Sequence, residues 1–285
     1  MSRIKALINP LSGSVPEDAD KLLAQALDEF GESCETILLD EDNFTSAIEE
    51  TFQGSPEIVI VWSGDGTVAC ALQKAGDAGP PILPLPGGTM NLFHKQIHRG
   101  ACEWQDCLKA SLTSGKQIDV PAGIAGDHRF YVAAMTGSLT DLAAPREAIR
   151  KGRILEAIQT LAGSDVLDLR TDMTFDLISD EHGKRSGFAT AAAMFVGDHT
   201  SSALEFAYID PDNHIELAAV GFGALVSDWR DASGVSTMLA NEVALSHEKG
   251  HGLRATLDGE PVRLPSGTKF RRLAKAGRAI SAMIE

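Results

Sequence analysis

The sequence predicts a parallel α/β domain followed by an antiparallel β domain, and three observations support this prediction. In the first 120 residues, short apolar runs alternate with segments whose apolar residues recur at helical spacing. From about Lys116, short strand-like runs are separated by Gly, Asp, Asn and His, which is typical of an antiparallel sandwich. Three glycine-rich turns interrupt the first part, each directly after an apolar run. We therefore expect an α/β domain over residues 1–120 and a β-sandwich domain over residues 121–285, with the boundary near Pro121.

Strands and helices alternate along the first domain. We expect strands at residues 5–8, 34–39, 57–62 and 81–86, and helices at residues 19–30, 44–52, 66–76 and 89–97. This alternation implies right-handed crossovers between parallel strands. Such sheets bind ligands at the carboxyl ends of their strands.

The second domain reads as β structure with one helical exception. Strand-like runs occupy residues 116–137, 166–179, 187–197, 203–210 and 214–220, and residues 145–163 have helical spacing. The basic segment 269–285 favours a solvated C-terminal helix face, with weak contact to a membrane surface as the alternative. This tail could also pack back on the first domain.

The amino-acid composition argues against several classes of protein. A net charge of −15 argues against a nucleic-acid partner, because binding to phosphate backbones needs a basic surface. No apolar run approaches the ~20 residues that span a bilayer, and the N-terminus lacks the apolar core of a signal peptide, so we expect a cytoplasmic protein. The four cysteines are too scattered for a disulfide framework or a zinc ribbon, and we interpret them as free thiols.

The glycine-rich turns at residues 9–13, 63–67 and 86–91 share one chemistry. Free backbone N–H groups and the positive end of a helix dipole favour phosphate at such turns. Thr67 and Thr89 are placed to cap the helices that follow. Asp65 puts a negative charge where anionic ligands bind, which indicates a metal ion or a proton-transfer step. No P-loop and no Rossmann dinucleotide motif is present.

Four motifs in order, NPLSG, SGDGT, PGGTMN and a late LDGEPV, resemble the diacylglycerol kinase catalytic-domain family, which includes sphingosine kinases and bacterial lipid kinases. The resemblance implies a nucleotide-binding α/β domain and a lipid-acceptor β-sandwich domain. It also implies transfer of the γ-phosphoryl group of ATP to a lipid hydroxyl with Mg²⁺, in lipid metabolism such as phospholipid biosynthesis. The partner is then a lipid substrate at a membrane surface, so the protein would associate peripherally with it. Whether the chain is a monomer or a homodimer is left open.

The resemblance also implies roles for individual residues. Asp258 and Glu260 fall on the Asp-Gly-Glu motif in which one carboxylate acts as base, and Asp65 would hold the catalytic Mg²⁺ or help to orient the acceptor hydroxyl. Asp212, in an acidic turn, would hold a structural Mg²⁺, with an Asx-turn without metal as the alternative. The residues expected at the nucleotide are Asn9, Ser12, Gly13, Ser63, Gly64, Gly66, Thr67, Gly88, Thr89 and Asn91.

Three positions depart from the family pattern and keep a second class of function open. Ala69 and Cys70 replace the usual Asn-Glu after SGDGT, and Leu92 replaces an aspartate that often follows Asn91. These changes remove polar groups near the nucleotide. The alternatives to a lipid kinase are therefore a non-catalytic nucleotide- or lipid-binding protein of the same fold, and an NAD kinase-like enzyme, because NAD kinases share a similar GGDGT loop.

Two histidine patterns resemble metal sites. His247 to His251 matches His-Glu-x-x-His, but Gly250 and Gly252 and the flanking strand-like runs argue against the helix that a zinc peptidase needs. His94 and His98 are four residues apart, and without a third ligand we interpret this pair as part of a helix surface.

Overall fold

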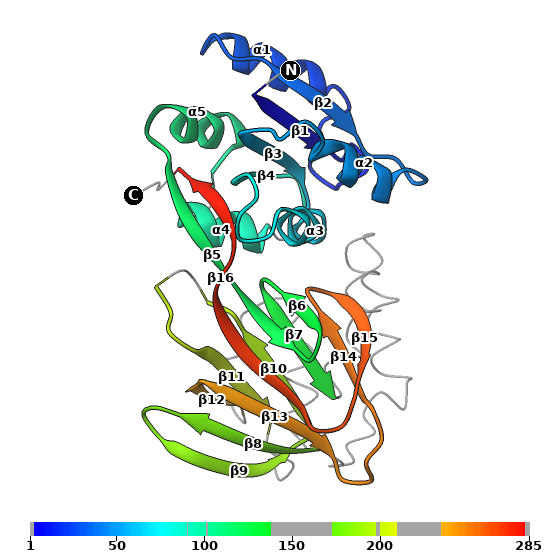
Figure 1. The fold of residues 1–285 in the computed structure, drawn as a ribbon, viewed down its shortest axis with the longest axis vertical. Helices are drawn as coiled ribbons and strands as arrows, with labels where there is room; N and C mark the ends of the chain where they lie inside the picture. Colours follow the sequence, from blue (N-terminus) through cyan, green and yellow to red (C-terminus); the bar gives the residue numbers. More distant parts are fainter. Residues whose placement is uncertain are drawn as a thin grey trace, which may run out of the picture. The chain divides into compact units, whose positions relative to one another are not determined.

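The computed structural model describes residues 3–89, 91–100, 102–137, 173–197, 200–209 and 235–282. The chain divides into two compact units, residues 1–121 with 274–285 and residues 122–273. It passes from the first unit to the second within β5 (Lys116–Ala125) and returns within β16 (Thr268–Ser281), as the ribbon in Figure 1 shows. The expected fold class, an α/β portion with a separate antiparallel β portion, is confirmed.

The first unit contains a parallel sheet in the order β2-β1-β3-β4. Its strands are β1 (Ile4–Ile8), β2 (Cys34–Leu38), β3 (Ile58–Ser63) and β4 (Ile82–Pro86), close to the predicted ranges. β1 lies between its two neighbours in register, with Ile4 opposite both Cys34 and Ile58. The end of β16 extends this sheet, where Ala279 pairs with Ile82 of β4 in parallel.

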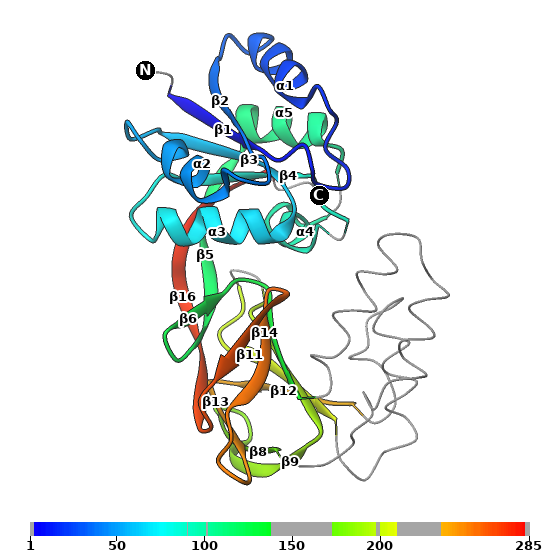
Figure 2. The ribbon, with the colours of Figure 1, turned by 90° about the vertical axis from the view of Figure 1, so that its right-hand side faces the viewer.

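Helices cover both faces of this sheet, as Figure 2 shows. α1 (Ala19–Asp28) and α5 (Trp104–Ser114) pack against one face, where Leu23 and Leu108 share a buried core with Trp62. α2 (Phe44–Thr51), α3 (Asp65–Ala75) and α4 (Leu92–His98) lie on the other face. We did not predict α5, although its buried residues recur at helical spacing.

The strand order explains where ligands can bind in this unit. β1 pairs with both β2 and β3, so the connections after β1 and after β3 leave the sheet in opposite directions. This is the switch point at which open α/β sheets form a crevice beyond the carboxyl ends of their strands. The turns at residues 9–13 and 63–67 follow these two strands.

The second unit is built from antiparallel strands. One sheet has the order β12-β11-β10-β7-β14-β15, and β16, β13, β8 and β9 form the other, with β5 and β6 beside β16. The strand bounds are β6 His128–Phe130, β7 Ala133–Gly137, β8 Met173–Ser179, β9 Gly183–Ala189, β10 Ala191–Phe195, β11 Leu204–Ile209, β12 Val235–Ala240, β13 Glu242–His247, β14 Leu253–Leu257 and β15 Glu260–Leu264. The helix expected at residues 145–163 and the strand at 214–220 lie outside the described residues.

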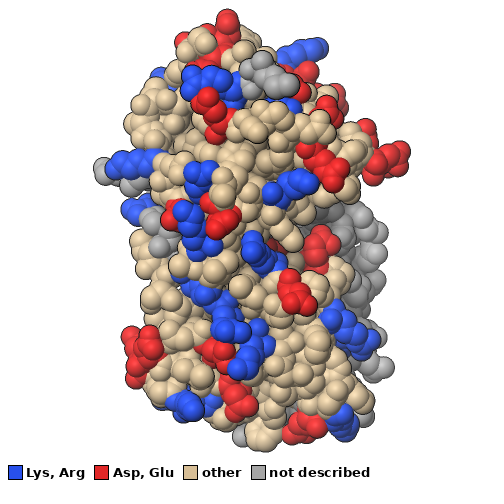
Figure 3. Space-filling model, viewed as in Figure 1, with Lys and Arg blue, Asp and Glu red and all other residues tan. Residues whose placement is uncertain are grey.

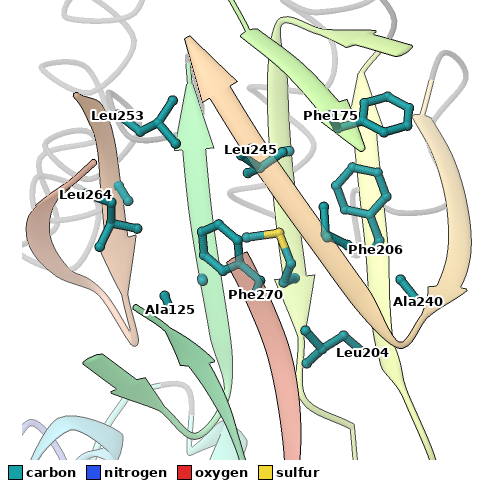
Figure 4. Close-up of a cluster of buried hydrophobic side chains, with 14 of the residues drawn as sticks. Ala125, Phe175, Leu204, Phe206, Ala240, Leu245, Leu253, Leu264 and Phe270 are labelled. Carbon is teal, nitrogen blue, oxygen red and sulfur yellow. The ribbon is translucent and has the colours of Figure 1, made fainter. Parts of the chain in front are cut away.

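A single hydrophobic core joins the two sheets of this unit (Figure 4). Phe175 from β8 and Phe206 from β11 meet edge to face, with ring centroids 5.1 Å apart. Phe270 of β16 packs on the same cluster and meets Phe130 at 6.5 Å. Burying such rings stabilises the sandwich by roughly 1.5–3 kcal/mol each.

The prediction of a solvated helix at the C-terminus was wrong, because residues 268–281 form β16. Basic side chains of β16 form ion pairs, each with a residue of the unit to which that part of β16 belongs. Lys269 and Arg271 bind Glu242 at 2.8 and 3.3 Å, and Lys275 binds Asp119 at 3.1 Å. Figure 3 shows both Lys and Arg and Asp and Glu side chains on this face. The membrane-contact alternative stays a prediction.

No helix among the described residues is long and apolar enough to cross a membrane.

Candidate active site

Three glycine-rich turns meet at the carboxyl ends of β1, β3 and β4. The Ser12 hydroxyl lies 3.2 Å from the Ser63 hydroxyl and accepts a hydrogen bond from the Gly64 N–H at 3.3 Å, which joins the first turn to the second. Ser14 joins the first turn to the third, because its N–H donates to the Gly87 carbonyl and its hydroxyl donates to the Gly88 carbonyl. The sequence predicts these turns at the carboxyl ends of the strands, and their hydrogen bonds join them in the fold.

Two glycines allow this close approach. A Cβ on Gly88 would lie 2.9 Å from the Gly64 Cα, and a Cβ on Gly87 would lie 2.6 Å from Val15. Any larger residue at 87 or 88 would therefore push the turns apart. Gly66 differs, because a Cβ there would meet nothing within 4 Å. Packing does not require glycine at 66, and its backbone borders open space.

The polar side chains of these turns mainly hold the turns in shape. Asn9 Oδ1 accepts from the Leu11 N–H at 3.0 Å, and Asn91 Oδ1 accepts from the Gly88 N–H at 2.7 Å. The buried Ser63 hydroxyl donates to the Thr67 hydroxyl at 2.8 Å. Because these side chains already form hydrogen bonds within the protein, the N–H groups of the first turn of α3 are the groups that can bind an anion.

The predicted threonine caps were wrong. Gly64 is the N-cap of α3, so Thr67 lies inside the helix, and Asn91 is the N-cap of α4, two residues after Thr89. Among the described residues, neither helix has a side-chain cap hydrogen bond at its own N-cap. Thr89 is exposed, and its hydroxyl oxygen lies 3.4 Å from the position that a Cβ on Gly13 would take.

Asp65 caps a different helix from its own. Its two carboxylate oxygens accept from the Leu92 N–H at 3.0 Å and from the Phe93 N–H at 2.8 Å, both at the N-terminus of α4. A carboxylate at a helix N-terminus is stabilised by the helix dipole. Asp65 therefore couples the second turn to the helix that follows the third, a structural role that the sequence did not indicate.

Asp258 and Glu260 lie on the β14–β15 hairpin of the second unit and differ in environment. Asp258 and Gly259 form the turn with φ of 50° and 92°, and both values are typical of a two-residue type I′ turn. The Asp258 carboxylate accepts three backbone N–H groups, from Tyr131, Val132 and Ala133, at 2.6 to 3.0 Å. Glu260 is exposed at the start of β15.

The structure gives a different outcome for each of the other residues considered as metal ligands. His247 ends β13 and Gly250 has φ of +70° in the turn that follows, so the His-Glu-x-x-His segment is not helical and the peptidase interpretation fails. Asp212 lies outside the described residues. His94 and His98 are only 3% and 0% exposed, so their interpretation as a helix surface was wrong.

A pocket of about 880 Å³ in the first unit lies away from these turns. It is lined by Ile4 and Ile58, the first residues of β1 and β3, and so opens at the amino ends of the strands. The switch-point rule favours the turns, because α/β sheets bind ligands at the opposite edge.

Comparison with known proteins agrees with these features. Residues 3–122 match the diacylglycerol kinase catalytic domain, which confirms the resemblance found in the motifs. A solved structure described as a diacylglycerol kinase from Bacillus anthracis has a TM-score of 0.66 at 15% identity, covering 98% of this chain and 96% of that one. A second structure from that organism, described as a candidate diacylglycerol kinase, has a TM-score of 0.68 at 14% identity, with 99% and 97% coverage. At these identities the likeness shows a shared fold.

Proposed function

Because residues 3–122 carry a match to a kinase-family catalytic domain, we propose that this chain is an ATP-dependent lipid kinase that transfers the γ-phosphoryl group to a lipid hydroxyl. The observation that carries the proposal is the convergence of the three turns, in which the Gly64 Cα lies only 2.9 Å from the position that a Cβ on Gly88 would take. Phosphoryl transfer depends on positioning and charge neutralisation, which a surface of backbone N–H groups supplies.

In these turns the side chains hold the structure, and the backbone N–H groups would bind the phosphates. Ser12 and Ser63 fix the first two turns relative to each other, and Asn91 holds the third turn in shape. The first-turn N–H groups of α3 are then oriented toward one region before a ligand arrives, so binding phosphate requires little reorganisation. Gly66 leaves this region open, which suits close approach of phosphate oxygens to the backbone.

Asp65 suits Mg²⁺ in its donor chemistry. Each of its oxygens accepts one N–H, which leaves each oxygen a further lone pair, and Mg²⁺ prefers carboxylate oxygens. When bound beside ATP, the metal would neutralise charge on the phosphates. Asp65 itself keeps α4 in place whether or not a metal is present.

Glu260 is the better candidate for the base than Asp258. Both oxygens of Asp258 accept backbone N–H groups, so taking up a proton there would break hydrogen bonds that hold residues 131–133. Glu260 is exposed and can accept the proton of a hydroxyl nucleophile. We assign the base to Glu260 and a positioning role to Asp258.

The test is ADP production from Mg·ATP over lipid hydroxyls in mixed micelles: diacylglycerol, a sphingoid base, an isoprenoid alcohol and a glycolipid. At least one acceptor should be phosphorylated. Glu260→Gln should lower turnover by about 10²–10⁴-fold, the usual contribution of a general base. ATP·Mg²⁺ should still raise the Tm of this variant, because nucleotide binding does not need the base.

A specific observation favours the non-catalytic alternative. Leu92, where an aspartate is usual in the resembling family, is 43% exposed directly beside the Asp65 carboxylate that its N–H contacts. A wild-type protein whose Tm responds to ATP·Mg²⁺, but which phosphorylates none of the four lipids and is unchanged by Glu260→Gln, would be a binding protein and not a kinase.

A further inference from the structure

Two histidines and two cysteines form a buried group in the first unit, which we call the His/Cys cluster: His94, His98, Cys102 and Cys107. The two histidines lie on α4, Cys107 lies on α5 and is 0% exposed, and Cys102 is half-buried just before α5. One ligand atom from each of His94, His98 and Cys107 lies within 4.8 Å of the ligand atoms of the other two. The Cys102 thiol lies 3.5 Å from His94 Nε2. The phosphate-binding turns use none of these four side chains.

One tautomer of His94 suits a metal site. With the proton on Nδ1, the ring donates to the Pro84 carbonyl oxygen 3.2 Å away, and the lone pair of the neutral ring is on Nε2, the atom next to Cys102. Histidines that bind metals are oriented in this way, with one ring N–H donated to a backbone carbonyl and the other nitrogen on the metal.

His98 is oriented by two backbone groups. The Ala282 N–H donates to His98 Nδ1 at 2.9 Å, so the proton is on Nε2, which donates to the Pro84 carbonyl at 2.9 Å. His98 is thus neutral, and both imidazoles contact the carbonyl oxygen of Pro84. His98 can bind a further group by giving up one of these two hydrogen bonds.

The spacing of the atoms suits a tetrahedral metal site. Bond lengths of about 2.3 Å to sulfur and about 2.05 Å to nitrogen, at a tetrahedral angle, put the two ligand atoms roughly 3.6 Å apart. His94 Nε2 and Cys102 Sγ are 3.5 Å apart. Thiolate and imidazole ligands select Zn²⁺ and related metals, whereas Mg²⁺ prefers oxygen.

We propose that the His/Cys cluster is a structural site for a zinc-class divalent metal, bound by His94, His98 and Cys107, whose ligand atoms lie within 4.8 Å of one another, and by Cys102 beside His94. The metal would join the C-terminal end of α4 to α5. Because α4 begins at the turn that holds Asn91 and accepts the Asp65 cap, the metal would also steady one of the three phosphate-binding turns. The proposal does not depend on which ligand those turns bind.

The test measures the metal content of the whole protein, purified under reducing conditions without chelator. We expect about one equivalent of zinc by elemental mass spectrometry, and a rise in Tm when Zn²⁺ is returned to chelator-treated protein. Co²⁺ should give thiolate-to-metal charge-transfer absorption and intense tetrahedral d–d bands.

Cys102→Ser, at a half-buried position that tolerates the change in polarity, should lose the metal and the charge-transfer intensity that Cys102 contributes. Cys34→Ser and Cys70→Ser change thiols outside the cluster and should keep both.

Three results would overturn the proposal. The first is wild-type protein that binds no Zn²⁺ or Co²⁺ above background after chelator treatment and reconstitution. The second is a Cys102→Ser variant with the metal content and spectrum of wild type. The third is a stable Cys102–Cys107 disulfide that persists under the reducing conditions of the assay, seen as a loss of two mass units, which would make the pair a redox element.

Discussion

At the scale of single residues, the three carboxylates in the sequence motifs differ in their hydrogen bonds and in their exposure to solvent. Asp65 accepts two backbone N–H groups and Asp258 accepts three, whereas Glu260 is exposed. A buried donor left without its acceptor costs about 1–3 kcal/mol. The two aspartates should therefore affect both stability and activity, and Glu260 should affect activity alone.

Asp258→Asn tests the positioning role. Asn tolerates the left-handed backbone conformation and favours the same Asn-Gly turn, so the change isolates the carboxylate. Its NH₂ group would face backbone donors at residues 131–133, and we expect a loss of roughly 1–3 kcal/mol in the free energy of unfolding. Denaturant titration measures this loss, with Glu260→Gln as the matched control of unchanged stability. Equal midpoints for the two variants would contradict the assignment.

Asp65→Asn tests the site in the first unit. The amide oxygen can still accept one N–H at the start of α4, so the protein should fold cooperatively with a modest decrease in Tm. Loss of the charge should lower lipid-kinase turnover by orders of magnitude, because in the proposed function this carboxylate holds Mg²⁺. Steady-state kinetics and a thermal melt separate the two effects. Retained turnover with a lowered Tm would show that the carboxylate serves only as a cap.

At the scale of elements, the N-terminus of α3 presents backbone to open space, and Gly66 is the position that tests it. Gly66→Ala adds a methyl group that meets no protein atom within 4 Å, and alanine favours a helix over glycine by about 0.5–1 kcal/mol. We expect an unchanged or higher Tm together with weaker binding of ATP·Mg²⁺, because the methyl group would occupy the approach to the N–H groups.

Gly100→Ala provides the control for this prediction. A Cβ at Gly100 also meets nothing within 4 Å, and Gly100 follows α4 at the end away from the turns. Isothermal titration with ATP·Mg²⁺ should therefore give the wild-type Kd for Gly100→Ala. Wild-type affinity for Gly66→Ala as well would place the phosphate elsewhere.

At the scale of the whole molecule, the chain completes its first unit with its last residues. In residues 274–285, Ala276, Ala279 and Ser281 are at most 1% exposed. The Arg278 guanidinium donates to the carbonyls of Ala78 and Gly79, and the Ser281 hydroxyl donates to the Ile97 carbonyl at 2.6 Å. The end of β16 also covers an edge of β4 that would otherwise present unpaired backbone groups.

Residues 1–121 expressed alone should therefore be unstable, with a broad thermal transition and rapid proteolysis. The same segment fused through a flexible linker to residues 274–285 should regain a cooperative melt, since the fusion restores the strand beside β4 and the Arg278 hydrogen bonds. Circular dichroism and limited proteolysis of the two proteins measure the difference. A stable, cooperative 1–121 fragment would show that β16 adds little to this unit.

Local patterns in the sequence were enough to predict the strands β1 to β4, the helices between them and the turns at their carboxyl ends. Apolar periodicity and glycine placement are properties of neighbouring residues, and they determine local conformation directly. The glycine-rich turns of the first domain, in their order, carried the part of the family resemblance that the match over residues 3–122 confirms.

The tertiary structure determined which partners these side chains and segments have. The Asp65 carboxylate finds its donors 27 and 28 residues away, and Asp258 finds its donors more than 120 residues away, so neither role is visible in a local pattern. The basic segment 269–285 was predicted as a solvated helix. Residues 268–281 form a strand instead, because β4 and β13 pair with them. The spacing of His94, His98, Cys102 and Cys107 was present in the sequence. Only the packing of α5 beside α4 buried these side chains together, because contacts between elements depend on the strand order and not on spacing along the chain.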